Sequence, residues 1–358
     1  MKYSNLKEKE KAILFGVTFK SSEDPSVSLT ELKGLCDTAD VETIYKDYQY
    51  VREITPATLI GKGKVEELKG LVDELNADLV VFDTELSGSQ ISNLSNILGV
   101  KVLDRSMLIL DIFALRAKTS EGKLQVELAQ LKYTLPRLSA ISGTSGRFGS
   151  GGVGMRGPGE TKLELDKRVI QKNILKIEEE LKQVKKQRQT RKSLNKQNNC
   201  KNVAIVGYTN AGKSTLLNLI TKENVYADNK LFATLDTTSR KVYLGDNKSI
   251  ILTDTVGFIN KLPHAFIEAF NSTLEESLDA DLLIHLVDAS DEHYKIKKEV
   301  VDNVLKELKA DNIPTLVVYN KIDDLKQEID LQNELKISAK KNIGVDNLKE
   351  KIKEILFN

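Results

Sequence analysis

The residues best suited to chemistry lie in one short stretch, GYTNAGKST at 207–215. Its spacing is that of a phosphate-binding loop, G-x-x-x-x-G-K-[ST], and it follows an apolar strand-like run and opens a helical pattern. In that context Gly207 and Gly212 let backbone N–H groups surround phosphates at the positive end of the helix. Lys213 would reach the β- and γ-phosphates, and the Ser214 hydroxyl would hold Mg²⁺. The stretch predicts a nucleoside triphosphate site.

A second motif selects the base. NKID at 320–323 ends a strand-like run, and the carboxylate of Asp323 can accept hydrogen bonds from the ring N–H and exocyclic amine of guanine. Adenine has no such donor pair, so a site of this kind discriminates strongly. We expect Asn320 near the base edge, the Lys321 stem over the ring and SAK at 338–340 closing over the base. The predicted substrate is GTP.

DTVGF at 254–258 follows another strand-like run. Asp254 would hold Mg²⁺ through water, and the Gly257 N–H would sense the γ-phosphate.

LFATLDTTSR at 231–240 lies between the phosphate loop and this strand. Thr234 is the candidate for a second Mg²⁺ hydroxyl, in a segment that becomes ordered when the γ-phosphate is present. Thr237 and Thr238 are the alternatives.

The group that orients the attacking water is missing from its usual place. Many GTPases have glutamine directly after the glycine of DxxG, where this chain has Phe258 and then Ile259. Slow intrinsic hydrolysis is therefore expected. His264 is either a replacement or an exposed switch residue. Asn210 either helps to hold K⁺ near the phosphates or is an ordinary loop residue.

The complete predicted site can be stated by role. The expected catalytic residues are Lys213, Thr234 and Gly257, and the expected Mg²⁺ ligands are Ser214, Thr234 and Asp254. The nucleotide is expected to contact Gly207, Tyr208, Thr209, Asn210, Ala211, Gly212, Lys213, Ser214, Thr215, Phe232, Ala233, Thr234, Leu235, Asp236, Asp254, Thr255, Val256, Gly257, Asn320, Lys321, Ile322, Asp323, Ser338, Ala339 and Lys340.

These residues need a scaffold, and the patterns predict an α/β protein in three segments. Residues 1–111 alternate strand-like and helical runs, which indicates a small, mostly parallel sheet. Residues 200–358 contain six strand-like runs, KNVAIVG, RKVYLG, SIILTD, DLLIHLVD, PTLVVYN and ELKIS, mostly separated by helical stretches. They predict a doubly wound, mostly parallel sheet for the nucleotide domain.

Residues 112–199 are different. Leucines from 124 to 138 and apolar residues from 170 to 184 recur at spacings of 4 and 3. This periodicity predicts two helices that pack along their apolar faces as an antiparallel hairpin. Pro136 would kink the first helix. Between them, 143–159 contains eight glycines in seventeen residues and no acid. That composition fits either a hairpin tip or an unstructured linker.

Charge is distributed unevenly. Residues 112–201 contain 20 Lys/Arg and 8 Asp/Glu, a net charge of +12, which leaves −11 for the rest of a chain whose total is +1. The basic region suits a polyanion such as RNA, or it is a solvated helix surface. No signal peptide or membrane span is evident, and two distant cysteines, Cys36 and Cys200, fit a reducing compartment. We expect a cytoplasmic monomer.

The chain resembles the HflX family, translation-associated GTPases of the Obg–HflX group. The resemblance covers nearly the whole chain, and its most specific parts are LIGKGKVEEL, LILDIFALRAKTSEGKLQVELAQLKYTLPRL, GGVGMRGPGETKLELDKR and LFATLDTTSR. It implies binding to the large ribosomal subunit and its rRNA, GTP hydrolysis accelerated there, and splitting or rescue of stalled ribosomes under stress. Longer members have a further C-terminal domain, which we do not expect in a chain ending at Asn358.

Two alternatives to a ribosomal GTPase are compatible with these motifs. One is an RNA- or partner-binding module in which GTP is a slowly hydrolysed structural ligand, as Phe258 would allow. The other is a GTPase of tRNA modification or membrane transport, which shares an asparagine like Asn210. In the ribosomal hypothesis Arg147 and Arg156 of the glycine-rich stretch would contact RNA phosphates or bases. GKGK at 61–64 is either an RNA or nucleotide contact or a strand-to-helix turn.

Overall fold

The computed structural model describes most of the chain. The described residues are 9–19, 24–138, 162–197, 200–221, 231–261, 263, 266, 269, 279–325 and 334–357, and the side chains of 188–197 are not described. Two compact units emerge: unit 1 is Met1–Leu115 with Glu127–Glu178, and unit 2 is Arg116–Val126 with Glu179–Asn358. Residues 116–126 therefore belong to unit 2 although the segments on both sides of them, up to 115 and from 127 to 178, belong to unit 1.

Unit 1 contains a parallel sheet of the order β2-β1-β3-β4. Its strands are β1 (Lys11–Thr18), β2 (Glu42–Tyr50), β3 (Leu79–Phe82) and β4 (Lys101–Asp104). Helices α2 (Lys62–Leu75) and α3 (Gly88–Leu98) pack against one face, on Ile13, Phe15 and Phe82. Helix α1 (Pro25–Thr38) lies against β1 and β2, and Leu29 reaches Gly16 on the side opposite that core. The predicted parallel α/β unit is confirmed, and GKGK forms the start of α2.

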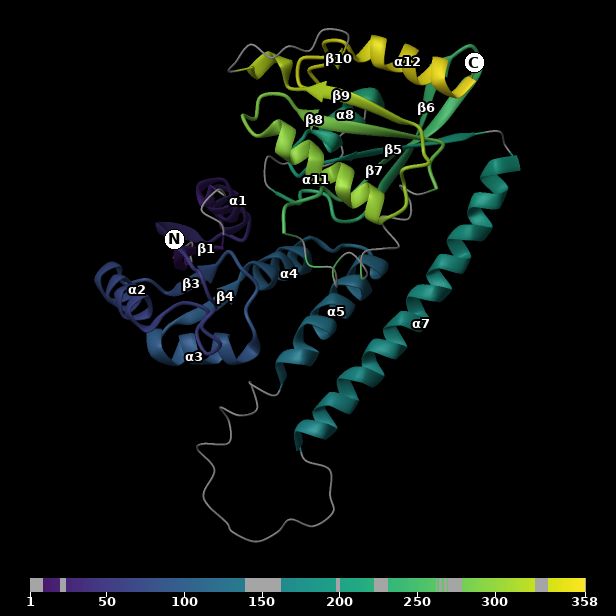
Figure 1. The fold of residues 1–358 in the computed structure, drawn as a ribbon. Helices are drawn as coiled ribbons and strands as arrows, with labels where there is room; N and C mark the ends of the chain where they lie inside the picture. The colour runs from purple at the N-terminus through teal and green to yellow at the C-terminus, as the bar shows by residue number, and fades with distance from the viewer. Residues whose placement is uncertain are drawn as a thin grey trace, which may run out of the picture. The chain divides into compact units, whose positions relative to one another are not determined.

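Three further helices follow. Helix α4 (Arg105–Arg116) spans the boundary predicted at residue 111, and α5 (Ser120–Thr134) ends in a 3-10 turn, η1 (Leu135–Arg137), at Pro136. Helix α7 (Lys162–Gln197) runs beside α5 in the opposite direction (Figure 1), with Lys132 Nζ 3.0 Å from a Glu178 carboxylate oxygen. Ile177, one of the predicted seam residues, is buried. The glycine-rich stretch 143–159 lies outside the described residues.

Unit 2 contains a sheet of the order β10-β9-β8-β5-β7-β6, in which only the β6–β7 pair is antiparallel. Its strands are β5 (Lys201–Gly207), β6 (Thr238–Gly245), β7 (Lys248–Asp254), β8 (Leu282–Asp288), β9 (Thr315–Asn320) and β10 (Leu335–Lys336). All six predicted strands are present.

Helices cover both faces of this sheet, because alternate strand residues point to opposite sides. Helices α8 (Lys213–Thr221) and α12 (Val345–Phe357) share one core with Ile284 and Leu286. Helix α11 (Tyr294–Glu307) covers the other face, where Val287 and Tyr319 pack with Tyr294. This is the doubly wound arrangement expected from the sequence, and it brings the loops after β5, β7 and β9 to one edge.

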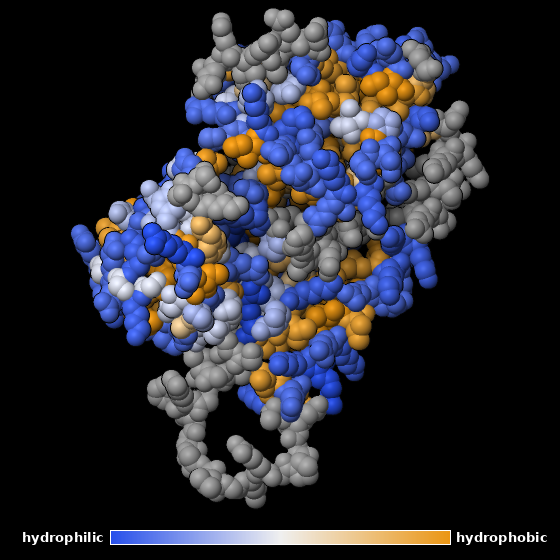
Figure 2. All heavy atoms as spheres, in the orientation of Figure 1, coloured by the Kyte–Doolittle hydropathy of each residue, from blue (hydrophilic) through white to orange (hydrophobic). Residues whose placement is uncertain are grey.

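The outer surface of α11 is mostly hydrophilic in the view of Figure 2: Val301 and Leu305 are buried, and Ile296 is exposed among lysines. Across the described part of the chain, no helix has both the length and the apolar character needed to cross a membrane.

Candidate nucleotide-binding site

The phosphate loop connects β5 to α8. Strand β5 is buried along its second half and delivers the chain to Gly207, and α8 begins at Lys213. Lys213 is itself buried, and its Nζ donates to the carbonyl oxygens of Gly207 at 3.1 Å and Tyr208 at 2.9 Å. Burial lowers the pKa of Lys213 to about 8, with the nearby Asp254 carboxylate acting in the opposite direction. The ammonium group is thus held inside the loop by the loop's own carbonyl oxygens.

Three predicted metal ligands meet beside this lysine. Ser214 Oγ donates to Asp254 Oδ2 at 2.6 Å, and Thr234 Oγ1 lies 2.7 Å from Ser214 Oγ and 3.1 Å from the same carboxylate oxygen. Of the three threonines considered, the structure brings Thr234 to this point, whereas Thr238 pairs with Asp254 through the β6–β7 ladder.

The carboxylate of Asp254 is fully buried, and burial raises its pKa against the opposing effects of Lys213 and the two hydroxyls. Its Oδ1 has no hydrogen-bond partner among the residues described here. A buried carboxylate oxygen left unpaired beside two hydroxyls fits a hard divalent cation, which takes oxygen ligands.

The segment after Asp254 is bound to the phosphate loop by its backbone. Thr209 N–H donates to Phe258 C=O at 2.7 Å, and Phe258 N–H donates to Gly207 C=O at 3.1 Å. The Phe258 side chain is buried and Ile259 is buried with it, so neither faces an incoming water. Gly257 approaches so closely that a Cβ there would lie 2.9 Å from Lys213 Nζ, which places its backbone at the phosphate end of the site.

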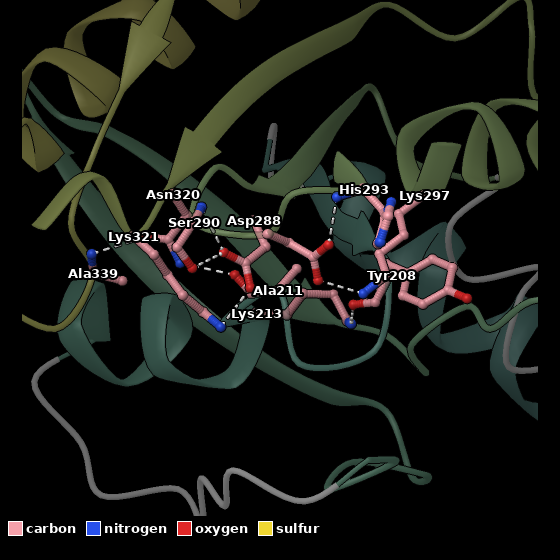
Figure 3. Close-up of polar contacts among 11 residues, drawn as sticks. Tyr208, Ala211, Lys213, Asp288, Ser290, His293, Lys297, Asn320, Lys321 and Ala339 are labelled. Atoms are coloured by element: carbon pink, nitrogen blue, oxygen red, sulfur yellow. Dashed lines mark hydrogen bonds and ion pairs between the residues drawn. The ribbon is translucent and has the colours of Figure 1, made fainter. Parts of the chain in front are cut away.

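Asn320 joins two loops at the other end (Figure 3). Its Nδ2 donates to Ala211 C=O at 2.8 Å, and its Oδ1 accepts from Ala339 N–H at 2.9 Å. The buried side chain thus uses both its donor and its acceptor to hold the phosphate loop to the SAK loop.

Lys321 and Asp323 are positioned by neighbours outside their own motif. Lys321 Nζ donates to Asp288 Oδ2 at 2.6 Å, at the end of β8. A hydrogen bond with Ser338 lowers the pKa of Asp323, which keeps that carboxyl ionised and able to accept from a base. Ser338 thereby connects the NKID and SAK motifs.

A cavity of about 800 Å³ joins the two ends of the site. It is lined by Thr209, Asn210, Gly212, Lys213, Ser214, Thr215, Phe232, Ala233, Thr234, Thr255, Gly257, Asn320, Lys321, Asp323, Asp324, Ala339, Lys340 and Lys341. The remaining predicted contact residues belong to the same segments but do not line this cavity: Gly207, Tyr208, Ala211, Leu235, Asp236, Asp254, Val256, Ile322 and Ser338. His264 lies outside the described residues.

Family models match the chain along most of its length. Residues 26–114 match the GTP-binding GTPase N-terminal model, 116–194 the GTP-binding GTPase middle region, and 202–321 the 50S ribosome-binding GTPase model. The GTPase HflX of Caldanaerobacter subterraneus is 52% identical over 352 residues, which cover 98% of this chain and 82% of the relative. The chain belongs to the HflX family of GTPases.

The Escherichia coli HflX GTPase is 42% identical over 97% of this chain and 83% of its own length. A GTP-binding protein of Sulfolobus solfataricus, solved with GDP, aligns over 97% of this chain and 98% of its own at a TM-score of 0.50 and 24% identity, which shows the shared fold. Membership of the HflX family makes this chain a GTP-binding GTPase, as the NKID motif predicts.

Sequence reasoning missed three residues of the site. Asp324 and Lys341 line the cavity, and Asp288 holds Lys321. Asp288 carried a usable signal, because it ends a buried strand of a parallel sheet and such ends converge on ligand sites. Lys341 directly follows SAK, but its place in the lining depends on the turn after β10.

Proposed function

We propose that this HflX-family GTPase binds the large ribosomal subunit and uses GTP hydrolysis in the splitting or rescue of stalled ribosomes under stress. The carrying observation is the match of residues 202–321, which contain the assembled GTP site, to a family described as 50S ribosome-binding GTPases. Such a partner places the activity in the cytoplasm.

The charge of the helical region supports an RNA-rich partner. Residues 112–201 carry a net charge of +12, concentrated in α7 and the segments flanking it. Rows of lysine and arginine attract phosphates through a salt-dependent term that requires no sequence recognition. Ribosomal RNA is the polyanion that the family description indicates.

Magnesium fits the oxygen cluster beside Lys213. Ser214, Thr234 and Asp254 would hold it, and the ion would neutralise charge on the β- and γ-phosphates. The chain's own residues do the remaining work. Lys213 contacts the phosphates, Thr234 and the Gly257 N–H respond to the terminal phosphate, and Asp323 selects guanine.

Water activation must come from somewhere other than the residue after DxxG. Phe258 is buried and paired with the phosphate loop, so intrinsic hydrolysis should be slow. Asn210 is exposed at the rim of the cavity with a left-handed backbone, and its side-chain amide is the proposed K⁺ contact. A ribosomal group would then complete the catalytic arrangement.

GTP turnover with purified subunits tests this proposal. The rate is measured for the full chain alone, with large subunits and with small subunits, each in K⁺ and in Na⁺ at equal ionic strength. We expect stimulation by large subunits alone, larger in K⁺. A chain lacking 143–159 should keep GTP binding and lose stimulation, and the substitution Asp246→Ala, on an exposed acid bonded to Lys353, serves as the control.

Two results would overturn the proposal. If neither subunit changes the rate in either salt, the ribosomal partner is wrong. If large subunits bind tightly but never accelerate hydrolysis, the second candidate holds, in which GTP is a structural ligand of a binding module. The buried Phe258 is the observation that favours that candidate.

A further inference from the structure

Asp236 makes a contact that nucleotide binding does not explain. Within unit 2, its Oδ2 accepts from the backbone N–H groups of Lys118 at 2.8 Å and Thr119 at 3.1 Å. Its Oδ1 accepts from the Thr119 hydroxyl at 2.5 Å. One carboxylate thereby takes three donors from a segment more than a hundred residues earlier in the chain.

Those donors belong to the beginning of α5. Thr119 directly precedes the helix, and its own hydroxyl oxygen accepts from Gly122 N–H at 2.9 Å, as in a helix N-cap. A carboxylate beside the first turn is favoured by the unpaired N–H groups and by the helix dipole. Asp236 therefore secures the N-terminal end of α5 from outside the helix.

The same loop carries the predicted γ-phosphate sensor. Thr234 contacts Ser214 and Asp254, and only Leu235 separates it from Asp236. Leu235 is buried, so the loop is anchored between the two polar contacts. Because a single residue separates them, we expect a displacement of Thr234 to be transmitted through the backbone to Asp236.

The other end of α5 is fixed in unit 1. The Tyr133 hydroxyl donates to Asp104 Oδ2 at 2.7 Å, and Arg137 donates to Leu86 C=O at 3.1 Å while its guanidinium lies 3.6 Å from the centre of the Tyr133 ring. Helix α5 is thus secured at its start by unit 2 and at its end by unit 1. It is suited to carry a change at Thr234 out of the nucleotide domain.

We propose that Asp236 is a positioning residue that couples occupation of the γ-phosphate site to the N-terminal end of α5. With Mg²⁺ and GTP bound, Thr234 would be held beside Ser214 and Asp254, and Asp236 would stay on Lys118 and Thr119. GDP releases Thr234 and weakens this contact. The proposal requires GTP binding but no ribosome, so it stands or falls separately from the proposed partner.

Gly122 allows a sharp test from the opposite side of the contact. A Cβ at Gly122 would lie 2.3 Å from Asp236 Oδ1, so Gly122→Ala must displace the carboxylate. The same change favours a helix, because alanine is a better helix former than glycine, so fraying of α5 would not be the cause of an effect. Gly70→Ala is the matched control, since it places the same methyl in α2 with no atom within 4 Å.

The first measurement is hydrogen–deuterium exchange of the 116–123 amides with Mg²⁺ and either GDP or a non-hydrolysable GTP analogue. We expect the Lys118 and Thr119 amides to exchange roughly tenfold more slowly with the analogue, a usual size for coupling between sites. Gly122→Ala and Asp236→Ala should abolish this nucleotide dependence, and Gly70→Ala should retain it.

The second measurement is nucleotide affinity, because coupling is reciprocal. Gly122→Ala should weaken binding of the GTP analogue by about the same tenfold factor and leave GDP binding unchanged. Equal exchange in both nucleotides for the unmodified chain would overturn the proposal. So would an equal loss of affinity for both nucleotides in Gly122→Ala, which would indicate a structural defect.

Discussion

The Tyr208 hydroxyl accepts a hydrogen bond from the backbone N–H of Asn260 over 2.7 Å. Tyr208 belongs to the phosphate loop, and Asn260 lies just beyond the DxxG glycine, Gly257. The same aromatic ring has Lys297 Nζ of α11 at 5.3 Å from its centre. One side chain therefore ties the phosphate loop to the switch segment and to a helix of the opposite sheet face (Figure 3 shows Tyr208 and Lys297).

Replacing Tyr208 separates these two contacts. Tyr208→Phe keeps the ring for Lys297 and removes the acceptor of a half-buried N–H, so the free energy of unfolding of unit 2 should fall by about 1 kcal/mol. Tyr208→Leu also loses the cation–π contact and should cost roughly 0.5–1 kcal/mol more. Urea unfolding followed by circular dichroism checks both, with unit 2 identified by the transition that GDP stabilises. If the urea midpoint of Tyr208→Phe equals that of the unmodified chain, the hydrogen bond from Asn260 does not stabilise unit 2.

Asp323→Asn should exchange the base preference. The substituted amide donates where the carboxylate accepted, so guanine loses its partners and a base with a carbonyl at that position gains one. We expect GTP affinity to fall by about a thousandfold or more and xanthosine triphosphate to bind better than GTP. Calorimetric titration with both nucleotides checks this, and Asp346→Asn, at an exposed acid in the first turn of α12, is the control. Unchanged GTP affinity would place the guanine contact elsewhere.

Asp302 predicts a pH-dependent contribution to stability. Its carboxylate lies 3.1 Å from His285 Nδ1 and 2.7 Å from Lys298 Nζ, and the interaction with His285 chiefly lowers its pKa from 3.8 to about 2. A depressed pKa stabilises the fold above 3.8, and this stabilisation declines as the pH falls towards 2. At pH 7, Asp302→Asn should lower the free energy of unfolding by about 1 kcal/mol, allowing for solvent screening.

Denaturant titrations at several acidic pH values measure the difference in the free energy of unfolding between Asp302→Asn and the unmodified chain. It should be constant from pH 7 to about pH 4 and shrink below it. A difference that grows on acidification would have the wrong sign for this carboxylate.

The two cysteines report on the two units. Burial raises the pKa of the Cys36 thiol to about 12, so almost no thiolate is present at neutral pH, whereas Cys200 is partly exposed. A disulfide reagent should therefore modify Cys200 rapidly and Cys36 only when unit 1 opens. In Cys200→Ser, the reaction rate should follow urea-induced unfolding of unit 1. Fast reaction of that variant in native buffer would show that Cys36 is accessible.

The nucleotide domain was largely predictable because its signals are local. The central strands have continuous apolar runs, and the stretches GYTNAGKST, DTVGF and NKID each begin at the last residue of a parallel strand. Parallel strands share a carboxyl edge, so motifs distant in sequence had to converge there. The structure adds which hydroxyl meets Asp254, since Thr234, Thr237 and Thr238 are chemically alike and only the path of the loop distinguishes them.

Contacts between distant segments could not be predicted. Asn320 uses both ends of its amide on Ala211 and Ala339, two contacts that its motif does not indicate. Arg105 is buried against Asp83 and Glu31, yet nothing in its neighbourhood marks it as a core residue. The helix it opens, α4, crosses the boundary predicted at residue 111.

The bond between Asp236 and the start of α5 also sets an order of events during synthesis. Lys118 is made 118 residues before its acceptor, a delay of roughly 6 to 24 seconds at ordinary elongation rates. Throughout that interval the first turn of α5 has only the Thr119 hydroxyl as its cap. The four strands of unit 1 are synthesised well before then, so the nascent chain has a complete sheet and an α5 whose start lacks the Asp236 contact until the nucleotide domain emerges.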